Sequence, residues 1–563
     1  MVQSEPEKRS LKTLLAAWET AVSGTNLPHP PAYDGPDVLI THLTEKTNEV
    51  TPGACFVARV RATSDGHPYI PQAIANGASL ILAQRPAKEL DITLPSNVVY
   101  WQVPDTAETL AWLAAAWEGF PSHQLTVIGV TGTDGKTTTA NLIHAILTAA
   151  GFKTGLLSTL RAVIGDEEEP LELHVTTPEA PVVQRYLRRM VDAGLTHCVL
   201  ETTSHGLAQH RVTAVDFDVA VVTNITHEHL DYHGDYDGYL AAKARLFHMV
   251  SNPSPFKPDN VKTAVLNQDD RSFATLAQIP TPRQITYGWQ PTADVHPTEV
   301  IYDRTRTWLT LNFNHPLGCQ NGRRLKPRMT FSVPAFTYLP GEFNVYNVLA
   351  ATAVARALNA PPEAIQTGLR NVVIVGGRME QIDLGQPFLT IVDFAHTPNA
   401  LEKAIQAGRH LLASRTENGR IITVFGSAGK RDIQKRRLMA EISARDADIT
   451  ILTAEDPRTE SLADILEMMA EGCRSQGGIE HKTFWRVPDR GQAIYFALTL
   501  AQPDDLVLIC GKGHEQSMCF GTTEYPWDDR EATRTALKAF LAGEPMPDLG
   551  LPTYRPEGDV YIS

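Results

Sequence analysis

Short apolar runs alternate with amphipathic segments along most of this chain. The runs Leu125–Val130, Leu195–Leu200 and Phe217–Val222 are short and rich in β-branched residues, which predicts buried strands. Leu11–Val22 and Thr139–Ala150 repeat their apolar residues at helical spacing and predict helices. We therefore expect an α/β fold in which helices cover largely parallel sheets.

The first 123 residues predict one small α/β domain. Strands are expected at Ala54–Val60 and Ser79–Ala83, helices at Tyr69–Asn76 and Thr106–Phe120, and a turn at Ser64–His67. Gly77 follows the shorter helix, as a glycine commonly does after a helix end. Pro121-Ser122-His123 breaks the last helix, and we place the first domain boundary there.

Residues 124–372 predict a second, larger domain. Its further expected strands are Val261–Leu266, Gln284–Gly288, Val300–Phe313 and Pro327–Val333. Helices are expected at Val183–Ala193 and Tyr239–Met249, and Gly341–Asn347 leads into a third helix that runs to Leu358. We also expect an acidic loop at Gly165–Glu169 and an exposed basic loop at Asn314–Lys326.

Residues 373–543 predict a third α/β domain. Strands are expected at Leu389–Val392, Ile421–Phe425, Asp448–Thr453 and Asp505–Cys510, with helices between them. This alternation is typical of a parallel, Rossmann-like sheet. The Pro-rich segment 544–563 is expected to be a tail.

Composition narrows the class of protein. With 563 residues, 43% hydrophobic and 20% charged, the chain is long enough for several well-packed globular domains. A net charge of −14 argues against nucleic acid as a partner. The six cysteines form no CxxC pair, which disfavours a zinc ribbon and fits a reducing cytoplasm. No secretion signal or membrane-spanning run is visible, so we expect a cytoplasmic protein without membrane contact.

The segment Val127–Asn141 carries the strongest chemical signal. A strand, a glycine turn, Lys136, a hydroxyl and a helix follow one another, which is the arrangement that binds a nucleotide triphosphate. The backbone of Gly132, Thr133, Gly135 and Thr138 would surround the phosphates, Lys136 would neutralise their oxygens, and Thr137 would bind Mg²⁺. The usual first glycine is replaced by Val130, but an ordinary strand-to-helix turn explains Gly-Lys-Thr-Thr poorly.

Two further features can hold metal. Glu201 ends a buried strand expected near the P-loop strand, where a carboxylate can bind Mg²⁺; a solvated acid is the alternative. The loop from His227 to His233 alternates His and Asp side chains with other residues. Zinc is one possibility, but with ATP expected nearby we favour His229 at a second Mg²⁺. For His227 and His233 a structural role is equally open.

Four strand ends of the third domain carry polar loops, namely Asp393–Asn399, Gly426–Asp432, Glu455–Arg458 and Gly511–Glu515. In an open α/β sheet ligands bind at the carboxyl ends of the strands. Together the four loops predict a site for a free amino acid and for one face of ATP.

These motifs resemble the Mur ligase family, and within it the MurE branch, over about residues 35–540. The resemblance rests on GTDGKTT, TTPE, ETTSHGLAQHR, TNITHEHLDYHGD, KARLF, GEFNVYN, GGRMEQI, DFAHTPNAL, DPR and GKGHE. It implies a three-domain architecture with a central P-loop domain and a C-terminal Rossmann-like domain. It also implies an ATP- and Mg²⁺-dependent ligase that adds the third amino acid to UDP-N-acetylmuramoyl-L-Ala-D-Glu, through an acyl phosphate, for peptidoglycan synthesis and hence cell shape and division.

The resemblance also implies roles for single residues. Lys136 and Thr137 would bind the triphosphate and Mg²⁺, with Glu201 and His229 as metal ligands and Lys243 carbamylated as a further one. ATP would contact Asn347, Arg378 and Asp393; the UDP-muramoyl peptide would contact Thr47, Thr176, Thr177, Thr203, Gln209 and Arg211; and the amino acid would contact Arg436, Asp456, Arg458, Gly511 and Glu515. The enzyme is expected to act as a monomer.

The chain departs from the family pattern at four segments. Thr203-Ser204 replaces Ser-Ser, and Ala428-Gly429-Lys430-Arg431-Asp432 replaces Gly-Gly-Asp-Arg-Asp. Lys46-Thr47-Asn48 replaces Asp-Ser-Arg near the expected uridine, and Glu455-Asp456-Pro457-Arg458 replaces Asp-Asn-Pro-Arg at the amino acid. Arg458 and Arg436 favour meso-diaminopimelate, which has two carboxylates, whereas Asp456 favours lysine or ornithine. We expect meso-diaminopimelate, by a small margin.

Two alternatives share the fold. One is a nucleotide-binding subunit of an amidotransferase or another complex, which the missing cysteine pairs disfavour. The other is a ligase for a different acceptor, such as folate, which the TTPE, GLAQHR and GKGHE stretches disfavour.

Overall fold

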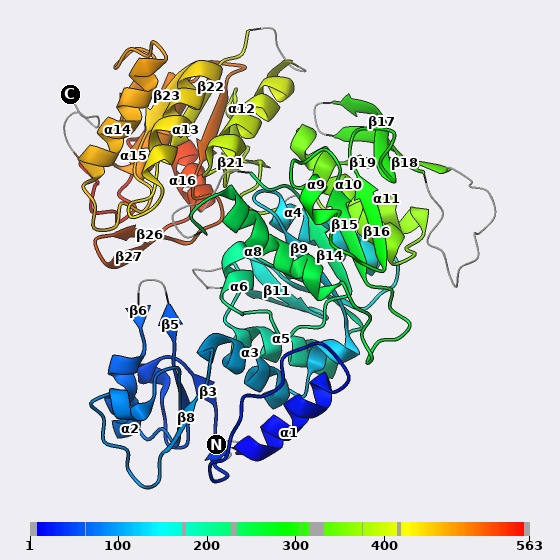
Figure 1. Ribbon diagram of the computed structural model, residues 1–563. Helices are drawn as coiled ribbons and strands as arrows, with labels where there is room; N and C mark the ends of the chain where they lie inside the picture. The colour runs from blue at the N-terminus through cyan, green and yellow to red at the C-terminus, as the bar shows by residue number, and fades with distance from the viewer. Residues whose placement is uncertain are drawn as a thin grey trace.

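A computed structural model describes residues 8–61, 64–171, 176–226, 233–303, 306–314, 331–373, 375–413 and 418–556. The described chain forms three main sheets, with four, eleven and six strands. The eleven-stranded sheet lies between the other two (Figure 1). The predicted α/β class is thereby confirmed.

The four-stranded sheet belongs to the N-terminal part. Its strands pair in parallel in the order β3 (Leu43–Thr44), β4 (Cys55–Ala58), β7 (Leu80–Ala83) and β8 (Val99–Gln102). The other elements here are α1 (Leu11–Val22), α2 (Ile70–Ala75), α3 (Thr106–Trp117), and the paired strands β1 (Arg9–Ser10) and β2 (Leu39–Ile40). The rings of Trp18 in α1 and Trp112 in α3 stack at 5.7 Å between centroids, which joins the two helices over the core.

One prediction in this part is wrong. The segment Ser64–His67 was expected to be a turn, but β6 (Ser64–Asp65) pairs antiparallel with β5 (Val60–Arg61). Serine and aspartate are common in turns, yet here they pair with Arg61 and Val60 across a short hairpin, and residue preference alone does not distinguish a turn from the second strand of such a hairpin.

The eleven-stranded sheet carries the P-loop strand near its middle. Its order is β12 (Glu167–Pro170), β11 (Arg161–Ile164), β10 (Thr154–Leu157), β13 (His197–Glu201), β9 (Thr126–Thr131), β14 (Val219–Val222), β15 (Thr263–Asn267), β16 (Arg283–Tyr287), β17 (Val295–Tyr302), β18 (Thr307–Phe313) and β19 (Phe331–Thr337). Strands from β10 to β17 are parallel, and antiparallel strands close both ends. The expected acidic loop at Gly165–Glu169 is therefore wrong in part, because Glu167–Pro170 is an edge strand, where charged side chains are tolerated.

Two helical layers cover this sheet. The layer around α4 (Lys136–Ala149), α10 (Glu342–Ala357) and α11 (Pro362–Asn371) buries one face. The layer around α5 (Ala180–Asp192), α6 (Ser204–Ala208), α8 (Tyr236–Met249) and α9 (Phe273–Leu276) buries the other. The predicted basic loop falls almost wholly in 315–330, outside the described residues.

The third sheet confirms the Rossmann-like prediction. Its order is β20 (Glu380–Gln381), β21 (Leu389–Asp393), β25 (Leu506–Cys510), β22 (Ile421–Phe425), β23 (Ile449–Leu452) and β24 (Phe484–Arg486), all parallel except β20. Around it lie α12 (Pro398–Ala413), α13 (Ile433–Asp446), α14 (Leu462–Ser475), α15 (Arg490–Leu500), α16 (Asp529–Ala542) and the hairpin of β26 (Ser517–Phe520) and β27 (Thr523–Pro526).

The described part of the expected tail, 544–556, packs on this third unit. Met546 and Leu551 are buried in its core, and the Gln492 side chain donates to the Arg555 carbonyl at 2.6 Å. None of the helices in the described ranges is long and apolar enough to cross a bilayer.

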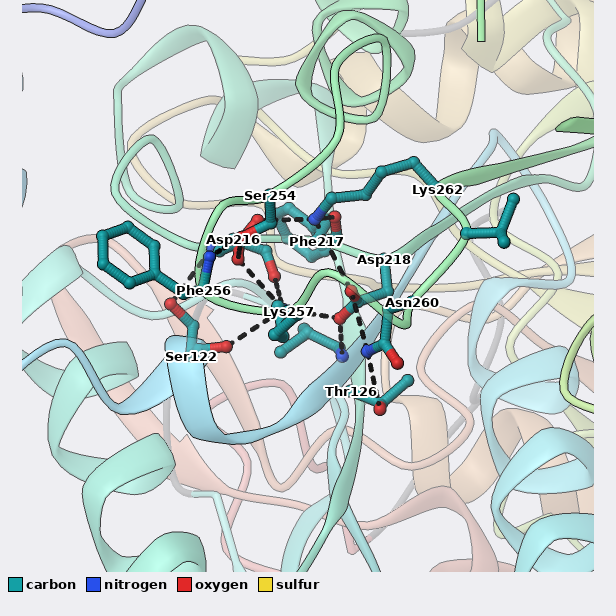
Figure 2. Close-up of polar contacts among 12 residues, drawn as sticks. Ser122, Thr126, Asp216, Phe217, Asp218, Ser254, Phe256, Lys257, Asn260 and Lys262 are labelled. Atoms are coloured by element: carbon teal, nitrogen blue, oxygen red, sulfur yellow. Dashed lines mark hydrogen bonds and ion pairs between the residues drawn. The ribbon is translucent and has the colours of Figure 1, made fainter. Parts of the chain in front are cut away.

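A buried ionic cluster ties the connection between the first two units to the central sheet (Figure 2). The Lys257 ammonium donates to the carbonyls of Ser122 and Leu125 at 3.0 and 3.1 Å and pairs with Asp218 at 2.6 Å. Asp216 pairs with both Lys257 and Lys262. The cluster lies where β14 begins, opposite the strand end that faces the P-loop.

Candidate functional site

The P-loop turn depends on two glycines. Gly132 and Gly135 have φ of 149° and 81°, and Gly135 precedes Lys136, the first residue of α4. A Cβ at Gly132 would lie 1.8 Å from the Thr223 hydroxyl, and one at Gly135 would lie 2.3 Å from the Asn347 amide oxygen. Only glycine fits at such close approach, so β14 and α10 hold the turn compact.

Two lysine amines meet at this turn. Lys136 donates to the carbonyls of Gly132 and Thr133 at 3.1 and 2.7 Å, and Lys243 donates to the same Gly132 carbonyl at 2.6 Å. Lys243 extends from α8, has 1% of its surface exposed, and lies 4.5 Å from the Tyr239 ring centroid. Because both amines share one acceptor, they lie within about 6 Å of each other and concentrate positive charge beside the turn.

Thr137 and Glu201 are in contact, as the sheet order requires. β13 and β9 are neighbours, with Glu201 opposite Val130, and the Thr137 hydroxyl donates to the Glu201 carboxylate at 2.9 Å. The second carboxylate oxygen accepts from the amide and hydroxyl of Thr159 at 2.9 and 3.0 Å. Glu201 is 1% exposed, so a buried carboxylate and a hydroxyl offer hard oxygen donors beside the turn, a set that fits Mg²⁺.

The expected histidine site is only partly described. Residues 227–232, and with them His227 and His229, lie outside the described residues. His233 is described, and its ring lies 5.3 Å from both His205 and Tyr239. Within the described ranges, no three His, Cys, Asp or Glu side chains converge as a metal site.

A cavity of about 290 Å³ lies between the P-loop and the third sheet. It brings together most of the predicted nucleotide contacts, which come from distant parts of the chain: Gly135, Thr137, Thr138, Asn347, Arg378 and Asp393. Lys136 and Gly132 adjoin it through the turn itself.

The third-sheet side of this cavity carries two side chains of opposite charge, Arg378 and Asp393. The Arg378 guanidinium lies 4.2 Å from the Phe394 ring centroid, and burial lowers the pKa of Arg378. The Asp393 carboxylate accepts from the amides of Met379 and Ala395 at 2.7 and 2.8 Å, and burial raises the pKa of Asp393. Because burial shifts both pKa values and both side chains line the cavity, they are candidates for contact with a polar ligand.

The predicted peptide contacts gather on the other side of Glu201. The Thr177 hydroxyl donates to the Glu201 carbonyl at 3.1 Å and lies 3.1 Å from the Thr203 hydroxyl. Arg211 donates to the Thr177 carbonyl at 2.7 Å and to the Gln209 side chain at 2.9 Å. Four of the six predicted residues thus form one hydrogen-bonded cluster.

The remaining two predicted contacts lie apart from these hydrogen bonds. Thr176 is half-buried next to Thr177, and Thr47 belongs to a short 3₁₀ helix in the N-terminal unit, where its carbonyl accepts from Asn76 at 2.8 Å.

The sequence interpretation missed an arginine that joins this cluster to the N-terminal unit. Arg59 follows β4, is buried, and pairs with Glu45 at 2.9 Å and with Glu179 at 2.6 Å. It also donates to the Gln209 carbonyl at 2.8 Å, while Glu179 pairs with Arg211 at 2.9 Å. A charged residue inside the otherwise apolar segment Ala54–Val60 was the available signal.

A second cavity, of about 150 Å³, lies at the carboxyl ends of the third sheet's strands. All four predicted loops reach it, and Asp456, Arg458, Gly511 and Glu515 line it. Arg436 does not line it. The Arg436 side chain is 0% exposed and forms an ion pair with the Glu460 carboxylate at 2.8 Å.

The charged side chains at this second cavity differ in the distance to their ion-pair partners. Lys512 pairs with Asp456 at 2.9 Å and with Glu515 at 2.6 Å, and although burial opposes its charge, these carboxylates raise the pKa of Lys512. The Arg458 guanidinium lies 3.9 Å from Asp456, at the limit of an ion pair. One oxygen of the buried Glu455 carboxylate has no hydrogen-bond partner in the described structure.

Comparison with known proteins agrees with this arrangement. The Mur ligase middle domain profile matches residues 130–355, and the profile of the Mur ligase glutamate ligase domain matches 377–513. A UDP-N-acetylmuramyl-tripeptide synthetase of Roseiflexus sp. (strain RS-1) is 42% identical, covering 88% of this chain and 94% of its own. A UDP-N-acetylmuramoyl-L-alanyl-D-glutamate–2,6-diaminopimelate ligase of Geobacillus thermodenitrificans is 39% identical, covering 89% and 95%.

Solved structures show the same architecture. A structure of a UDP-N-acetylmuramoyl-L-alanyl-D-glutamate–2,6-diaminopimelate ligase has a TM-score of 0.57 at 28% identity, covering 91% of this chain and 98% of that one. MurF ligase from Thermotoga maritima, solved with ADP, has a TM-score of 0.56 at 19% identity, covering 89% and 96%, and so supports the fold alone.

With the matches to Mur ligase profiles and to named ligases, the P-loop and the cavity that it shares with a Rossmann-like unit identify an ATP-dependent ligase. The chain belongs to the Mur ligase family.

Proposed function

We propose that this protein is the ATP-dependent amide ligase that adds the third amino acid to UDP-N-acetylmuramoyl-L-Ala-D-Glu in cytoplasmic peptidoglycan synthesis, acting as a monomer. The observation that carries the proposal is the 42% identity to a tripeptide synthetase over nearly the full length of both chains. The contacts of Glu201 are consistent with it. Its carboxylate accepts from Thr137 of the P-loop, and its backbone carbonyl accepts from Thr177, one of the predicted peptide contacts.

Each unit has one task in this proposal. Residues 1–123 hold the uridine end of the acceptor, with Thr47 among its contacts. Residues 124–372 bind the triphosphate and, through Thr176, Thr177, Thr203, Gln209 and Arg211, the acceptor's peptide. Residues 373–543 supply Arg378 and Asp393 to ATP and bind the amino acid at the second cavity. Segment 544–556 supports the third unit by packing on α15.

The reaction joins two anions, and the basic side chains make this possible. A carboxylate of the dipeptide's D-Glu attacks the γ-phosphorus of ATP, the bond to the β-phosphate oxygen breaks, and ADP leaves with that electron pair. Lys136 and the Arg378 side of the cavity offset the charge of both reactants. The amine of the amino acid then attacks the acyl phosphate carbon, loses a proton, and phosphate leaves.

Thr137 and Glu201 would hold Mg²⁺, which when bound offsets phosphate charge as a Lewis acid. His229 is proposed as a ligand of a second Mg²⁺. Gly132, Thr133, Gly135 and Thr138 shape the turn around the phosphates, and Asn347 supports it from α10.

Lys243 is proposed to carry a carbamate, formed when its neutral amine attacks CO₂ and releases a proton. Lys243 is buried and its amine donates to the Gly132 carbonyl, which places a carbamate on this side chain beside the P-loop. The neutral amine is the form that reacts with CO₂. The product is an anion beside the P-loop, able to act as a metal ligand.

For the amino acid we propose meso-diaminopimelate. Lys512 offsets the charge of Asp456, while Arg458 stands at the limit of ion-pair distance from it and lines the cavity. Arg458 is thus positioned to pair with a second substrate carboxylate, with Gly511 and Glu515 beside it. Arg436 acts indirectly in this proposal, through its ion pair with Glu460.

The deciding experiment measures ADP release by the purified protein with UDP-N-acetylmuramoyl-L-Ala-D-Glu and a panel of amino acids, with dihydrofolate and tetrahydrofolate plus glutamate as alternative acceptors. Release that requires both the UDP-dipeptide and a diamino acid supports the proposal. Release only with a folate, or none with any acceptor, contradicts it and favours the other ligase or the subunit of a complex.

A further inference from the structure

We propose that a hydrogen bond between Asn399 and Asp134 sets the third unit on the P-loop, which makes the two residues positioning residues of the nucleotide site. This inference rests on the proposed function for its kinetic readout. The Asn399 amide donates to the Asp134 carboxylate at 3.0 Å, and both side chains line the 290 Å³ cavity.

At the P-loop end of this contact, side chains hold the backbone of Asp134 by hydrogen bonds. The Asp134 carbonyl accepts from the Thr223 hydroxyl at 2.6 Å and from the Asn224 side chain at 3.1 Å, and the Asp134 amide donates to Asn224 at 3.1 Å. These contacts hold the Asp134 backbone against the end of β14. The carboxylate that accepts from Asn399 therefore starts from a fixed backbone position.

The other end is fixed to the residues that face ATP. Asn399 is the second residue of α12, and the chain reaches it directly from Asp393, Phe394 and His396, which line the same cavity. Holding Asn399 against the turn therefore also holds this segment across from the phosphates. Asp134 is close enough to act on it electrically, since its charge adds to the effect of burial in raising the pKa of Asp393.

The contact also offsets an unfavourable charge. A carboxylate in a phosphate-binding turn repels a triphosphate, and Asp134 occupies such a position. The Asn399 amide and the N-terminus of α12, a helix of 16 residues, both favour a negative charge at this point. Loss of the donor would leave the carboxylate facing the phosphates.

A reciprocal exchange tests the pair. Asn399→Asp places two carboxylates together and should raise the KM for ATP about tenfold or more. Asp134→Asn keeps a hydrogen bond and should change it by less than about threefold. The double variant Asp134→Asn/Asn399→Asp restores donor and acceptor in reversed order, so its KM for ATP should return to within about threefold of the unmodified protein. The KM for the UDP-dipeptide should stay unchanged throughout.

Gln406→Glu is the matched control, because it adds a carboxylate to the exposed side of α12. A normal KM for ATP in Asn399→Asp, or a double variant no better than that single variant, overturns the proposal. Asn399→Ala, which removes the donor without adding charge, carries the test if Asn399→Asp does not fold, and an unchanged KM for ATP there overturns the proposal as well.

Binding of a fluorescent ATP analogue to the same variants gives a readout that needs no acceptor. Its affinity should fall in Asn399→Asp and recover in the double variant, even if the unmodified protein releases no ADP with the UDP-dipeptide. An absence of ADP release by the unmodified protein with the UDP-dipeptide would overturn the proposed function alone. Equal affinities in all variants would overturn the positioning role alone.

Discussion

The Thr137 hydroxyl lies 2.9 Å from the Glu201 carboxylate, so the first turn of α4 and the end of β13 share one polar contact. Lys136 precedes Thr137, and its amine folds back onto the carbonyls of Gly132 and Thr133. The P-loop thus brings its cation and its oxygen donors together at one turn.

Lys136→Ala should reduce ADP formation at least about a hundredfold, because it removes the cation that offsets phosphate charge. Steady-state ADP release measures this, and circular dichroism checks the fold. Lys153→Ala, an exposed lysine of the same unit, is the control and should keep normal activity. Turnover near normal in folded Lys136→Ala would refute the nucleotide assignment.

Lys243→Ala should be nearly inactive, and formate or acetate should restore part of its activity by replacing the carbamate's carboxylate. Activity of the unmodified protein should fall when CO₂ and bicarbonate are removed. Formate should not rescue Lys136→Ala, which separates a missing anion from a missing cation. A high-resolution map of active protein with a bare Lys243 amine would contradict the carbamate.

Arg211→Ala should raise the KM for the UDP-dipeptide about tenfold while the KM for ATP stays within about twofold. A planar guanidinium suits a substrate carboxylate, and the loss of one charge-assisted hydrogen bond has this size. Arg211 also pairs with Glu179, so a purely structural role would affect both substrates alike. Arg185→Ala on the exposed side of α5 is the control.

Most of the fold could be predicted because its signals are local. α1 has the predicted bounds, and the polar loops of the third unit meet at one cavity because parallel strands place their ends together. The hairpin of β5 and β6 and the edge strand β12 were not predicted, because Ser, Asp and Glu disfavour strands and pairing with the neighbouring strand outweighs that preference. The Asp134–Asn399 contact was not predicted for another reason, since its partners are 265 positions apart.

The sequence predicted which residues belong to the candidate site, but not which side chains contact one another there. By sequence, Asp456 favoured lysine or ornithine as the substrate, whereas in the structure Lys512 offsets the charge of Asp456 from another strand end. Arg436 belonged to the predicted amino-acid site by sequence, yet its side chain is engaged with Glu460. Burial and partner choice of long side chains depend on packing, which a linear pattern does not record.

The stability of the protein should fall as the pH falls from about 7.5 to 5. Burial lowers the pKa of His123 to about 4 from its ordinary 6.5, and its ring stacks on Phe256 beside the ionic cluster of Lys257. Between these values the unfolded chain binds the proton and the folded chain does not, so His123 removes about 2 kcal/mol of stability by pH 5.

His123→Phe should abolish this part of the pH dependence, as measured by denaturant unfolding at pH 7.5 and 5. His29→Gln, at an exposed histidine, should leave the dependence as it is in the unmodified protein. The same loss of stability on acidification in His123→Phe would show that His123 is not its source.

The preference for the added amino acid should depend on Arg458. In the unmodified protein kcat/KM should be higher for meso-diaminopimelate than for lysine or ornithine, and Arg458→Ala should lose about tenfold or more of it for meso-diaminopimelate alone. Lys512→Met should shift the preference towards lysine and ornithine, because it releases the charge of Asp456. If the unmodified protein prefers lysine or ornithine and Arg458→Ala does not change this, the acidic side chains set the specificity and the role given to Arg458 is wrong.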